Sequence, residues 1–239
     1  MAEPKKKKRI VSADTGETVQ AGSRKKKAAK PVGNTVGLRA GAIILWILAL
    51  GMEVVALLIF NGTFALNFMP SLTQIIVALV IDLIFVIIGS QLWKKANHIK
   101  PASEKNKLTF WLWNNMGVIV CAIAFIPFVI LALTDKKADK KTKAVATVVA
   151  IIALLIGGLF SYDFNPVSEE EQQAAIEAIS DDVYWSPFGK VYHTHEDCHA
   201  LNRSDELTYG TVEQAIAAGR TRLCSFCADN DEITGVVTD

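Results

Sequence analysis

Charge is nearly absent from four long stretches of this 239-residue chain. Two of them contain one acidic residue each, Glu53 and Asp82, and the other two contain none. A helix of a soluble bundle needs a polar stripe toward water, and none of the stretches has one, which excludes a soluble core. A bilayer core requires about 20 apolar residues per helix. Four transmembrane helices are therefore expected, at residues 40–60, 72–93, 108–133 and 144–162.

Cysteine is scarce as well. The chain has four cysteines, and Cys121 lies inside an apolar stretch, which leaves three in the C-terminal part. Three cysteines cannot form a closed disulfide framework, but they suit a metal site with three thiolates and one imidazole. One disulfide with a free thiol is the alternative. Neither a Gly-rich phosphate loop nor a nucleophile paired with a base is recognisable, so an enzyme is not expected.

Acidic residues are few in the first two thirds of the chain and numerous after that. Residues 1–160 carry 21 Lys and Arg against 8 Asp and Glu, whereas residues 161–239 carry 4 against 16. This asymmetry indicates different surroundings for the two parts. Residues 1–39 combine two basic clusters with few apolar residues, and we expect this arm to be disordered. The cluster Lys5–Arg9 resembles a nuclear-import signal, but beside a membrane segment such a cluster is more often a topology determinant and a contact for anionic lipids.

The basic residues also predict an orientation in the membrane. The N-terminal arm and the loop 94–107 are rich in Lys and Arg, and the loop 61–71 has no charge, which places the N-terminus in the cytoplasm. The loop 134–143 carries five lysines, yet it lies outside if all four stretches span. Either this loop is tolerated outside and the C-terminal part is cytoplasmic by parity, or residues 108–133 are re-entrant and the C-terminal part is exterior. Four ordinary spans are the preferred interpretation.

Glu53 and Asp82 are the notable polar groups inside the membrane stretches. A carboxylate at mid-bilayer is costly and is a candidate functional group for that reason. A small transporter that uses both acids is one alternative function. The competing interpretation is that each acid is protonated or is hydrogen-bonded to a neighbouring helix.

An acidic helical linker is expected at residues 163–182. Ser168 and Glu171 have the spacing of a capping box, and the helix that they begin should extend to about Ile179. The acidic first turn suits the positive end of the helix dipole.

The pattern after the linker predicts a small α+β domain at residues 183–228. Two strand-like runs flank Pro187-Phe188-Gly189, which indicates a hairpin. A short helix should begin after Thr211, as N-cap, and end at Gly219. Residues 229–239 are expected to form a frayed tail.

Nitrogen and sulfur ligands gather at two points of this domain. His193 and Cys198 follow the hairpin, and Cys224 and Cys227 form a Cys-x-x-Cys after the short helix. Two such knuckles are what a tetrahedral zinc site requires, so we predict a structural zinc bound by these four residues. His195 is the alternative to His193, which is preferred because it ends a strand. Four protein ligands leave no position for a catalytic water.

Two further alternatives concern the same residues. His199 also competes for the fourth ligand position. A redox-active Cys224-x-x-Cys227 is the rival of the metal site, but that chemistry usually sits at a helix N-terminus, whereas this pair follows a helix.

A family resemblance rests on short motifs within residues 183–228: Tyr192-His193, Cys198, Glu213-Gln214-Ala215, Ala218-Gly219-Arg220 and Cys224-x-x-Cys227. Together they resemble the small metal-binding domain of the Ada DNA-repair protein and the short Cys/His modules appended to bacterial nucleases and membrane proteins. The resemblance implies a zinc site and, in Ada itself, methyl transfer from DNA phosphate to a zinc-bound thiolate. His193 stands where the Ada domain has a fourth cysteine. Nucleic acid is not an expected partner here, because DNA affinity depends on neutralising phosphates and the C-terminal part is acidic.

The membrane half, with Gly89–Asn97 and Asp163–Pro166, is similar to uncharacterised multi-span proteins of Gram-positive bacteria, which implies no activity. The sequence therefore predicts an α-helical membrane protein with four transmembrane helices and a small C-terminal α+β zinc-binding domain. The expected function is a membrane-anchored binding or sensing module with an unknown protein partner. A transporter or an Ada-like thiolate alkyl acceptor is the alternative. The lipid bilayer is the expected surrounding, and a homo-oligomer is a further alternative.

Overall fold

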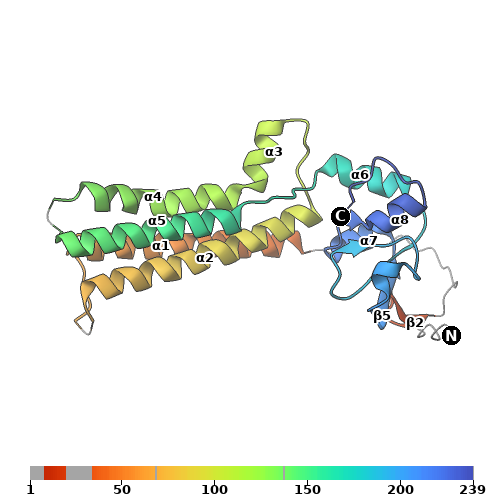
Figure 1. Cartoon of the computed structure of the whole chain (residues 1–239), viewed down its shortest axis with the longest axis horizontal. Helices are drawn as coiled ribbons and strands as arrows, with labels where there is room; N and C mark the ends of the chain where they lie inside the picture. Colours follow the sequence, from red (N-terminus) through yellow and green to blue (C-terminus); the bar gives the residue numbers. More distant parts are fainter. Residues whose placement is uncertain (1–7, 20–33, 68, 137, 239) are drawn as a thin grey trace. The chain divides into compact units, whose positions relative to one another are not determined.

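The computed structural model describes residues 8–19, 34–67, 69–136 and 138–238, and it divides into two compact units (Figure 1). The first unit, called the bundle below, comprises Thr35–Asn97 and Lys105–Pro166. The second, called the C-terminal domain, contains Val167 and the residues after it, together with residues 8–19 and His98–Glu104. The charge distribution also indicates two parts, but it divides them near residue 160, whereas residues 8–19 and His98–Glu104 belong to the C-terminal domain.

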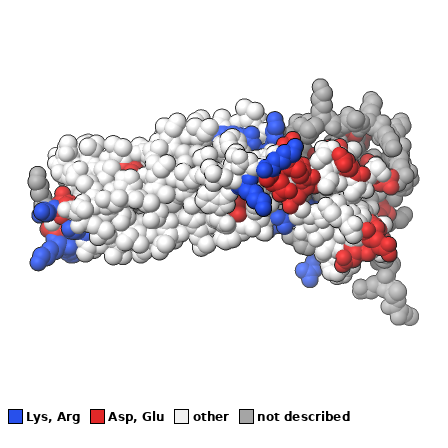
Figure 2. Space-filling model, turned by 90° about the horizontal axis from the view of Figure 1, so that it is seen from above, with Lys and Arg blue, Asp and Glu red and all other residues white. Residues whose placement is uncertain are grey.

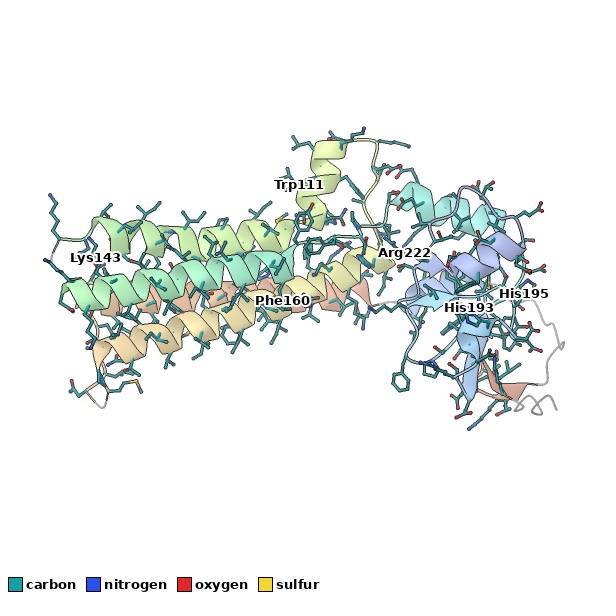
Figure 3. The ribbon with its side chains drawn as sticks, in the orientation of Figure 1. Trp111, Lys143, Phe160, His193, His195 and Arg222 are labelled. Carbon is teal, nitrogen blue, oxygen red and sulfur yellow. The ribbon has the colours of Figure 1, made fainter. Side chains whose placement is uncertain are left out.

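The bundle consists of helices. Its five helices within the described residues are α1 (Thr35–Phe60), α2 (Ser71–Ile99), α3 (Lys107–Asn114), α4 (Met116–Thr134) and α5 (Lys140–Ser161). All of them except α3 are long and apolar enough to cross a membrane, which confirms the four predicted membrane helices. Figure 2 shows a long uncharged surface with Lys and Arg at its ends, and Lys143 and Phe160 lie toward opposite ends of α5 (Figure 3).

Small residues line the inside of the bundle, at spacings of three or four residues on α5 and of seven, eight or eleven residues on the other long helices, which keep them on one face of each helix. They are Ala42, Ala49, Ala56, Ala78, Gly89, Ala96, Gly117, Ala124, Ala132, Ala146, Ala150, Ala153 and Gly157. Large aliphatic side chains point outward instead, among them Ile47 at 63% exposure and Leu155 at 67%. Small residues inside and large apolar residues outside are typical of helices packed in lipid, where burial of apolar area does not drive association.

The long helices alternate in direction. At one end of the bundle, Arg39 near the start of α1 donates to Asn97 near the end of α2, at 3.3 Å. At the same end, the backbone N–H of Asp163 after α5 donates to the Asn115 side chain before α4, at 3.2 Å. α4 is continuous through Pro127, so the re-entrant alternative for this stretch finds no support in the helix itself.

The third predicted span differs from the structure at its start. Residues 108–133 were expected to form one helix, but α3 and α4 are separated at Asn115. The side chains of Asn114 and Asn115 donate to the carbonyls of Phe110 and Trp111, at 3.1 and 3.0 Å. Such local bonds compete with the regular helix ladder, which explains the break and the shorter membrane helix.

The C-terminal domain mixes short helices and strands. They are β1 (Arg9–Ser12), β2 (Thr18–Val19), α6 (Glu169–Ala178), β3 (Val183–Trp185), β4 (Val191–Tyr192), the 3₁₀ helix η1 (His199–Leu201), β5 (Glu206–Gly210), α7 (Val212–Ala217), β6 (Arg222–Leu223) and α8 (Ser225–Asn230). Capping boxes begin both α6, at Ser168 and Glu171, and α7, at Thr211 and Gln214. Gly219 has φ +85° after α7, as its place at the helix end predicts.

The hairpin is present in a reduced form. Tyr184 and His193 form a single antiparallel bridge, with both backbone bonds at 2.7 Å. Beyond this bridge the two strands join different sheets, because β3 pairs with β5 and β4 pairs with β6. The turn between them carries Phe188, which is 98% exposed.

Part of the N-terminal arm contradicts the expectation of disorder for residues 1–39, because residues 8–19 contain the strands β1 and β2. β1 pairs with β2 and adds in parallel to β5, which gives a four-stranded sheet of order β2-β1-β5-β3. Ile10 on β1 is buried, and the Lys8 ammonium group donates to the carbonyl of Glu196 at 2.9 Å. A strand of four residues with one buried apolar side chain is too short to be recognised in a basic, polar sequence. Residues 1–7 and 20–33, including the cluster Arg24–Lys27, lie outside the described residues.

The end of the chain is also more regular than the expected frayed tail at 229–239. The Leu223 N–H donates to the Val237 carbonyl at 3.1 Å, and Leu223 pairs with Thr238. Ile233 and Val236 pack against the core of the domain. Two apolar residues in a polar tail are sufficient to hold it against the domain.

Candidate metal site

Two of the four predicted ligands are placed by one pair of parallel strands. β4 and β6 pair with Tyr192 opposite Leu223, and both of these side chains are fully buried. His193 and Cys224 are the next residues of the two strands, so they emerge side by side at the same sheet end. The Cys224 N–H donates to the Tyr192 carbonyl at 2.9 Å, which fixes the spacing between the strands at this point.

The other two ligands come from turns that open short helices. Cys198 precedes η1, and its carbonyl accepts from the Leu201 N–H at 2.9 Å. Cys227 lies in the first turn of α8, and its N–H donates to the Cys224 carbonyl at 3.1 Å. The tight turn from Cys224 to Cys227 directs both thiols to one point.

The structure brings His193, Cys198, Cys224 and Cys227 into one group. One ligand atom from each residue lies within 4.8 Å of all the others, and the Cys227 Sγ lies 3.8 Å from the His193 Nδ1. In a tetrahedral site with Zn–S bonds of about 2.3 Å and Zn–N bonds of about 2.0 Å, neighbouring ligand atoms are roughly 3.6–3.8 Å apart. The four cysteines of the chain are free thiols here. This group could therefore hold a metal ion such as zinc.

The thiols of the group differ in acidity. Burial opposes ionisation of Cys227, but hydrogen bonds from His193, Thr194 and Cys198 outweigh burial and lower the pKa of this thiol. Burial raises the pKa of Cys198, and the neighbouring thiols of Cys227 and Cys224 raise it further. A thiol that ionises readily beside other thiols and an imidazole suits a metal ion, because the metal binds thiolates and releases protons as it does so.

His195 lies outside this group. Its Nε2 is 2.6 Å from the Asp231 Oδ1, and its side chain is 45% exposed (Figure 3). The hydrogen bond to Asp231 raises the pKa of this histidine. His199 packs its ring against Phe226 instead, with centroids 4.9 Å apart. Of the three histidines that compete for the fourth position, the geometry favours His193.

One argument against a redox-active pair is wrong. Cys224 is the N-cap residue of α8, so the Cys-x-x-Cys does begin a helix, which the sequence reasoning overlooked because α8 has only six residues. The neighbours of the pair now favour metal binding over disulfide chemistry. His193 and Cys198 converge on the same point as the two thiols, and a redox pair has no need of either.

The choice between the histidines can be tested directly. We expect His193→Ala to lower the bound zinc of the full-length protein to well below one equivalent, because a ligand is lost. His195→Ala is the matched control and should keep about one equivalent, as a closed four-ligand site requires. Elemental analysis of the purified proteins measures both. Loss of zinc in His195→Ala with retention in His193→Ala would assign the fourth position to His195.

The remaining candidate residues lie in the bundle. Glu53 on α1 and Asp82 on α2 are both buried in its core, at 4% and 0% exposure. Their carboxylate oxygens have no hydrogen-bond partner within the described residues. The alternative of hydrogen bonds to polar side chains on neighbouring helices therefore finds no support, and the backbone of Phe128 on α4 is a polar group that faces Glu53.

Comparisons with known proteins leave the chain without a recognised relative. No family model matches it, and no curated protein or solved structure matches it either. The likeness to the Ada domain and to membrane proteins of Gram-positive bacteria accordingly rests on the sequence motifs alone. What stands is a multi-span membrane protein with a Cys₃His group that could bind a metal ion.

Proposed function

We propose that this protein is a non-enzymatic, membrane-anchored binding module, in which a structural zinc stabilises a domain that binds a protein partner. The observation that carries the proposal is the closed Cys₃His group. Four protein ligands complete a tetrahedral zinc site and leave no position for a substrate or a reactive water. Such a metal contributes to folding rather than to chemistry, and a small domain with little core benefits most from it.

The surface of the domain supports a partner of basic character. Residues 161–239 carry 16 Asp and Glu against 4 Lys and Arg. From Val167 onward two phenylalanines are exposed, Phe188 at 98% and Phe226 at 58%. Exposed aromatic side chains within a polar surface are typical anchors of protein–protein contacts. Phe188 stands on the tight turn between β3 and β4, where a partner can surround it.

The binding proposal is tested with the full-length protein. Chemical cross-linking in native membranes, followed by purification, should yield a specific partner for the wild type. We expect Phe188→Ala to reduce the yield of the cross-linked complex several-fold while bound zinc stays unchanged, because this side chain touches no ligand. Phe64→Ala, an exposed phenylalanine of the bundle, is the matched control.

Two outcomes would contradict the binding proposal. One is the same pattern of cross-links for the wild type and Phe188→Ala. The other is an irreversible mass gain on Cys198, Cys224 or Cys227 after treatment with a methylating agent, which would favour the Ada-like alkyl acceptor.

The sheet supports a location of the C-terminal domain on the same side of the membrane as the N-terminus. β1 belongs to the N-terminal arm and β5 to the C-terminal domain, and their backbones are hydrogen-bonded over four residue pairs. Two segments of one sheet lie on the same side of a bilayer, so this pairing supports an even number of spans between them. The basic arm favours the cytoplasm for the N-terminus, which extends the assignment to the C-terminal domain.

The lysine-rich connection between α4 and α5 would then lie outside. Asp135 and Asp139 lower the net positive charge of this connection. Asp139 also caps α5, because its side chain accepts from the N–H groups of Lys141 and Thr142. The Lys143 ammonium group is tied to the Asp135 carbonyl at 2.9 Å. These contacts lessen the conflict between a basic loop and an exterior position.

A reporter fusion tests the sidedness. A reporter that is active only in the cytoplasm should be active when fused after Asp239, and equally active when fused before Met1. A fusion in the loop after α1, at Thr63, should be inactive and serves as the control. Reporter activity at only one of the two termini would contradict both the pairing of β1 with β5 and the four-span topology.

A further inference from the structure

The core of the bundle contains two carboxyl groups at positions where its other helices carry small residues. Glu53 lies between Ala49 and Ala56 on the inner face of α1, and Asp82 follows Ala78 on the inner face of α2. At 4% and 0% exposure, both face other helices and not the lipid.

Both acids also lie deep along the helix axes. With about 1.5 Å per residue, Glu53 is roughly 10 Å from the end of α1, and Asp82 is roughly 16 Å from the start of α2. These two helix ends belong to the same end of the bundle, since α1 and α2 run in opposite directions (Figure 1). The hydrocarbon core of a bilayer is about 30 Å thick, so both carboxyl groups lie within it.

The surroundings of the pair offer no positive charge. None of the four carboxylate oxygens forms a hydrogen bond of good geometry within the described residues, although the backbone of Phe128 on α4 faces Glu53. No Lys, Arg or His is among the buried side chains described in the bundle. Asp82 interacts electrostatically with Glu53 and, on α4, with the thiol of Cys121. From α5, the buried side chain with an unpartnered polar atom is the neutral Thr147 hydroxyl. Repulsion between two carboxylates is therefore not compensated by the protein.

Such a pair needs a bound cation, and the available ligands decide which one. Two carboxylates that share a buried site cannot both remain ionised, because desolvation and mutual repulsion add. Calcium and magnesium take six or more oxygen ligands. The two carboxyl groups and one hydroxyl provide too few oxygens for either ion. A proton requires only one oxygen of each acid.

We propose that Glu53 and Asp82 form an intramembrane proton-binding site, in which at least one of the two buried carboxyl groups holds an exchangeable proton. Protonation of either acid lowers the negative charge that the core of the bundle carries. This site lies beyond the proposed binding function of the C-terminal domain and does not depend on it. It gives the bundle a role other than anchoring, because a change in the proton occupancy changes the charge in the middle of the helix packing.

A hydrophobic carbodiimide tests the proposal, since it reacts from within the membrane with protonated carboxyl groups. The acid oxygen bonds to the central carbon of the reagent, the acid proton moves to a reagent nitrogen, and the adduct rearranges to a stable N-acylurea. In proteoliposomes with the full-length protein, we expect modification of Glu53 or Asp82, identified by peptide mass spectrometry. The rate should fall as the pH rises, because only the protonated form reacts.

Variants and added ions separate the possible results. The Glu53→Gln/Asp82→Asn double variant should lose the modification and the infrared carbonyl band of a buried protonated acid, and the isosteric amides should keep the bundle folded. Glu213→Gln on α7 is the matched control and should change neither signal. If sodium ions at constant pH protected the two acids from modification, the site would bind a metal cation instead of a proton, and the proposal would be overturned. Absence of both the modification and the infrared band in the wild type would also overturn it.

Discussion

Replacing Cys224 with serine is expected to remove the metal and unfold the C-terminal domain while the bundle stays folded. Cys224 is 4% exposed and lies at the junction of β6 and α8, where its N–H also holds β4. A structural zinc contributes about 10–16 kcal/mol to the folding of small zinc-dependent peptides. This is comparable with the whole stability of most domains, roughly 5–15 kcal/mol, so loss of a ligand leaves too little free energy to keep the domain folded.

Zinc content and limited proteolysis of the full-length protein measure this effect. The wild type should hold about one zinc per chain and resist cleavage after Val167, whereas Cys224→Ser should hold little zinc and be cleaved within the domain. Cys121→Ala is the matched control, because Cys121 is the cysteine of the bundle and should not affect the metal. A Cys224→Ser protein with full zinc occupancy and wild-type resistance would refute the Cys₃His assignment.

The membrane half could be predicted from the sequence because one physical property determines it. A run without charge and long enough for the bilayer predicts a helix regardless of its partners, and all four predicted runs have one. The packing inside the bundle could not be predicted from the sequence in this way. The small residues on the inner faces become meaningful only when the direction and rotation of each helix are known.

The metal ligands could be predicted for a different reason. Cys-x-x-Cys is a local motif, so the chemistry of Cys224 and Cys227 is visible in five residues of sequence. The choice of His193 over His195 depended on the strand that His193 ends, and the pairing of β4 with β6 supplies the reason that was missing. That pairing joins residues about 30 positions apart through two-residue strands, which are too short to recognise by pattern.

The pairing of β1 with β5 is the feature that sequence reasoning missed most clearly. It joins the two ends of the chain through backbone hydrogen bonds, and backbone bonds leave no signature in the side chains. Low apolar content correctly indicates that residues 1–39 cannot fold alone. It does not exclude that a short part of the arm adds to the edge of a domain formed elsewhere. Ile10, the buried apolar residue of β1, is the signal that the sequence offered.

The helices of the bundle pack so closely at Gly117 that a substitution there is expected to have a large effect on stability. A Cβ added at Gly117 on α4 would lie 2.6 Å from the Ser90 Cβ and 3.2 Å from the Ser161 Cβ. Ser90 cannot simply rotate away, because its Cβ is fixed by the α2 backbone. Its hydroxyl also donates to the Val86 carbonyl at 2.7 Å and accepts from Ser161 at 2.8 Å. The three helices must therefore separate to admit a single methyl group.

We expect Gly117→Ala to destabilise the bundle by about 1–3 kcal/mol, the usual cost of overpacking, with a further loss if the hydrogen bond between Ser90 and Ser161 breaks. Thermal unfolding of the full-length protein in detergent, followed by helical circular dichroism, measures the change. Gly158→Ala on α5 is the matched control, because nothing lies within 4 Å of the added Cβ. Since alanine favours helices over glycine by up to about 1 kcal/mol, this control should be as stable as the wild type or slightly more stable. Equal stability of both variants would mean that α2, α4 and α5 do not meet at Gly117, and the close packing described for the bundle would have to be abandoned.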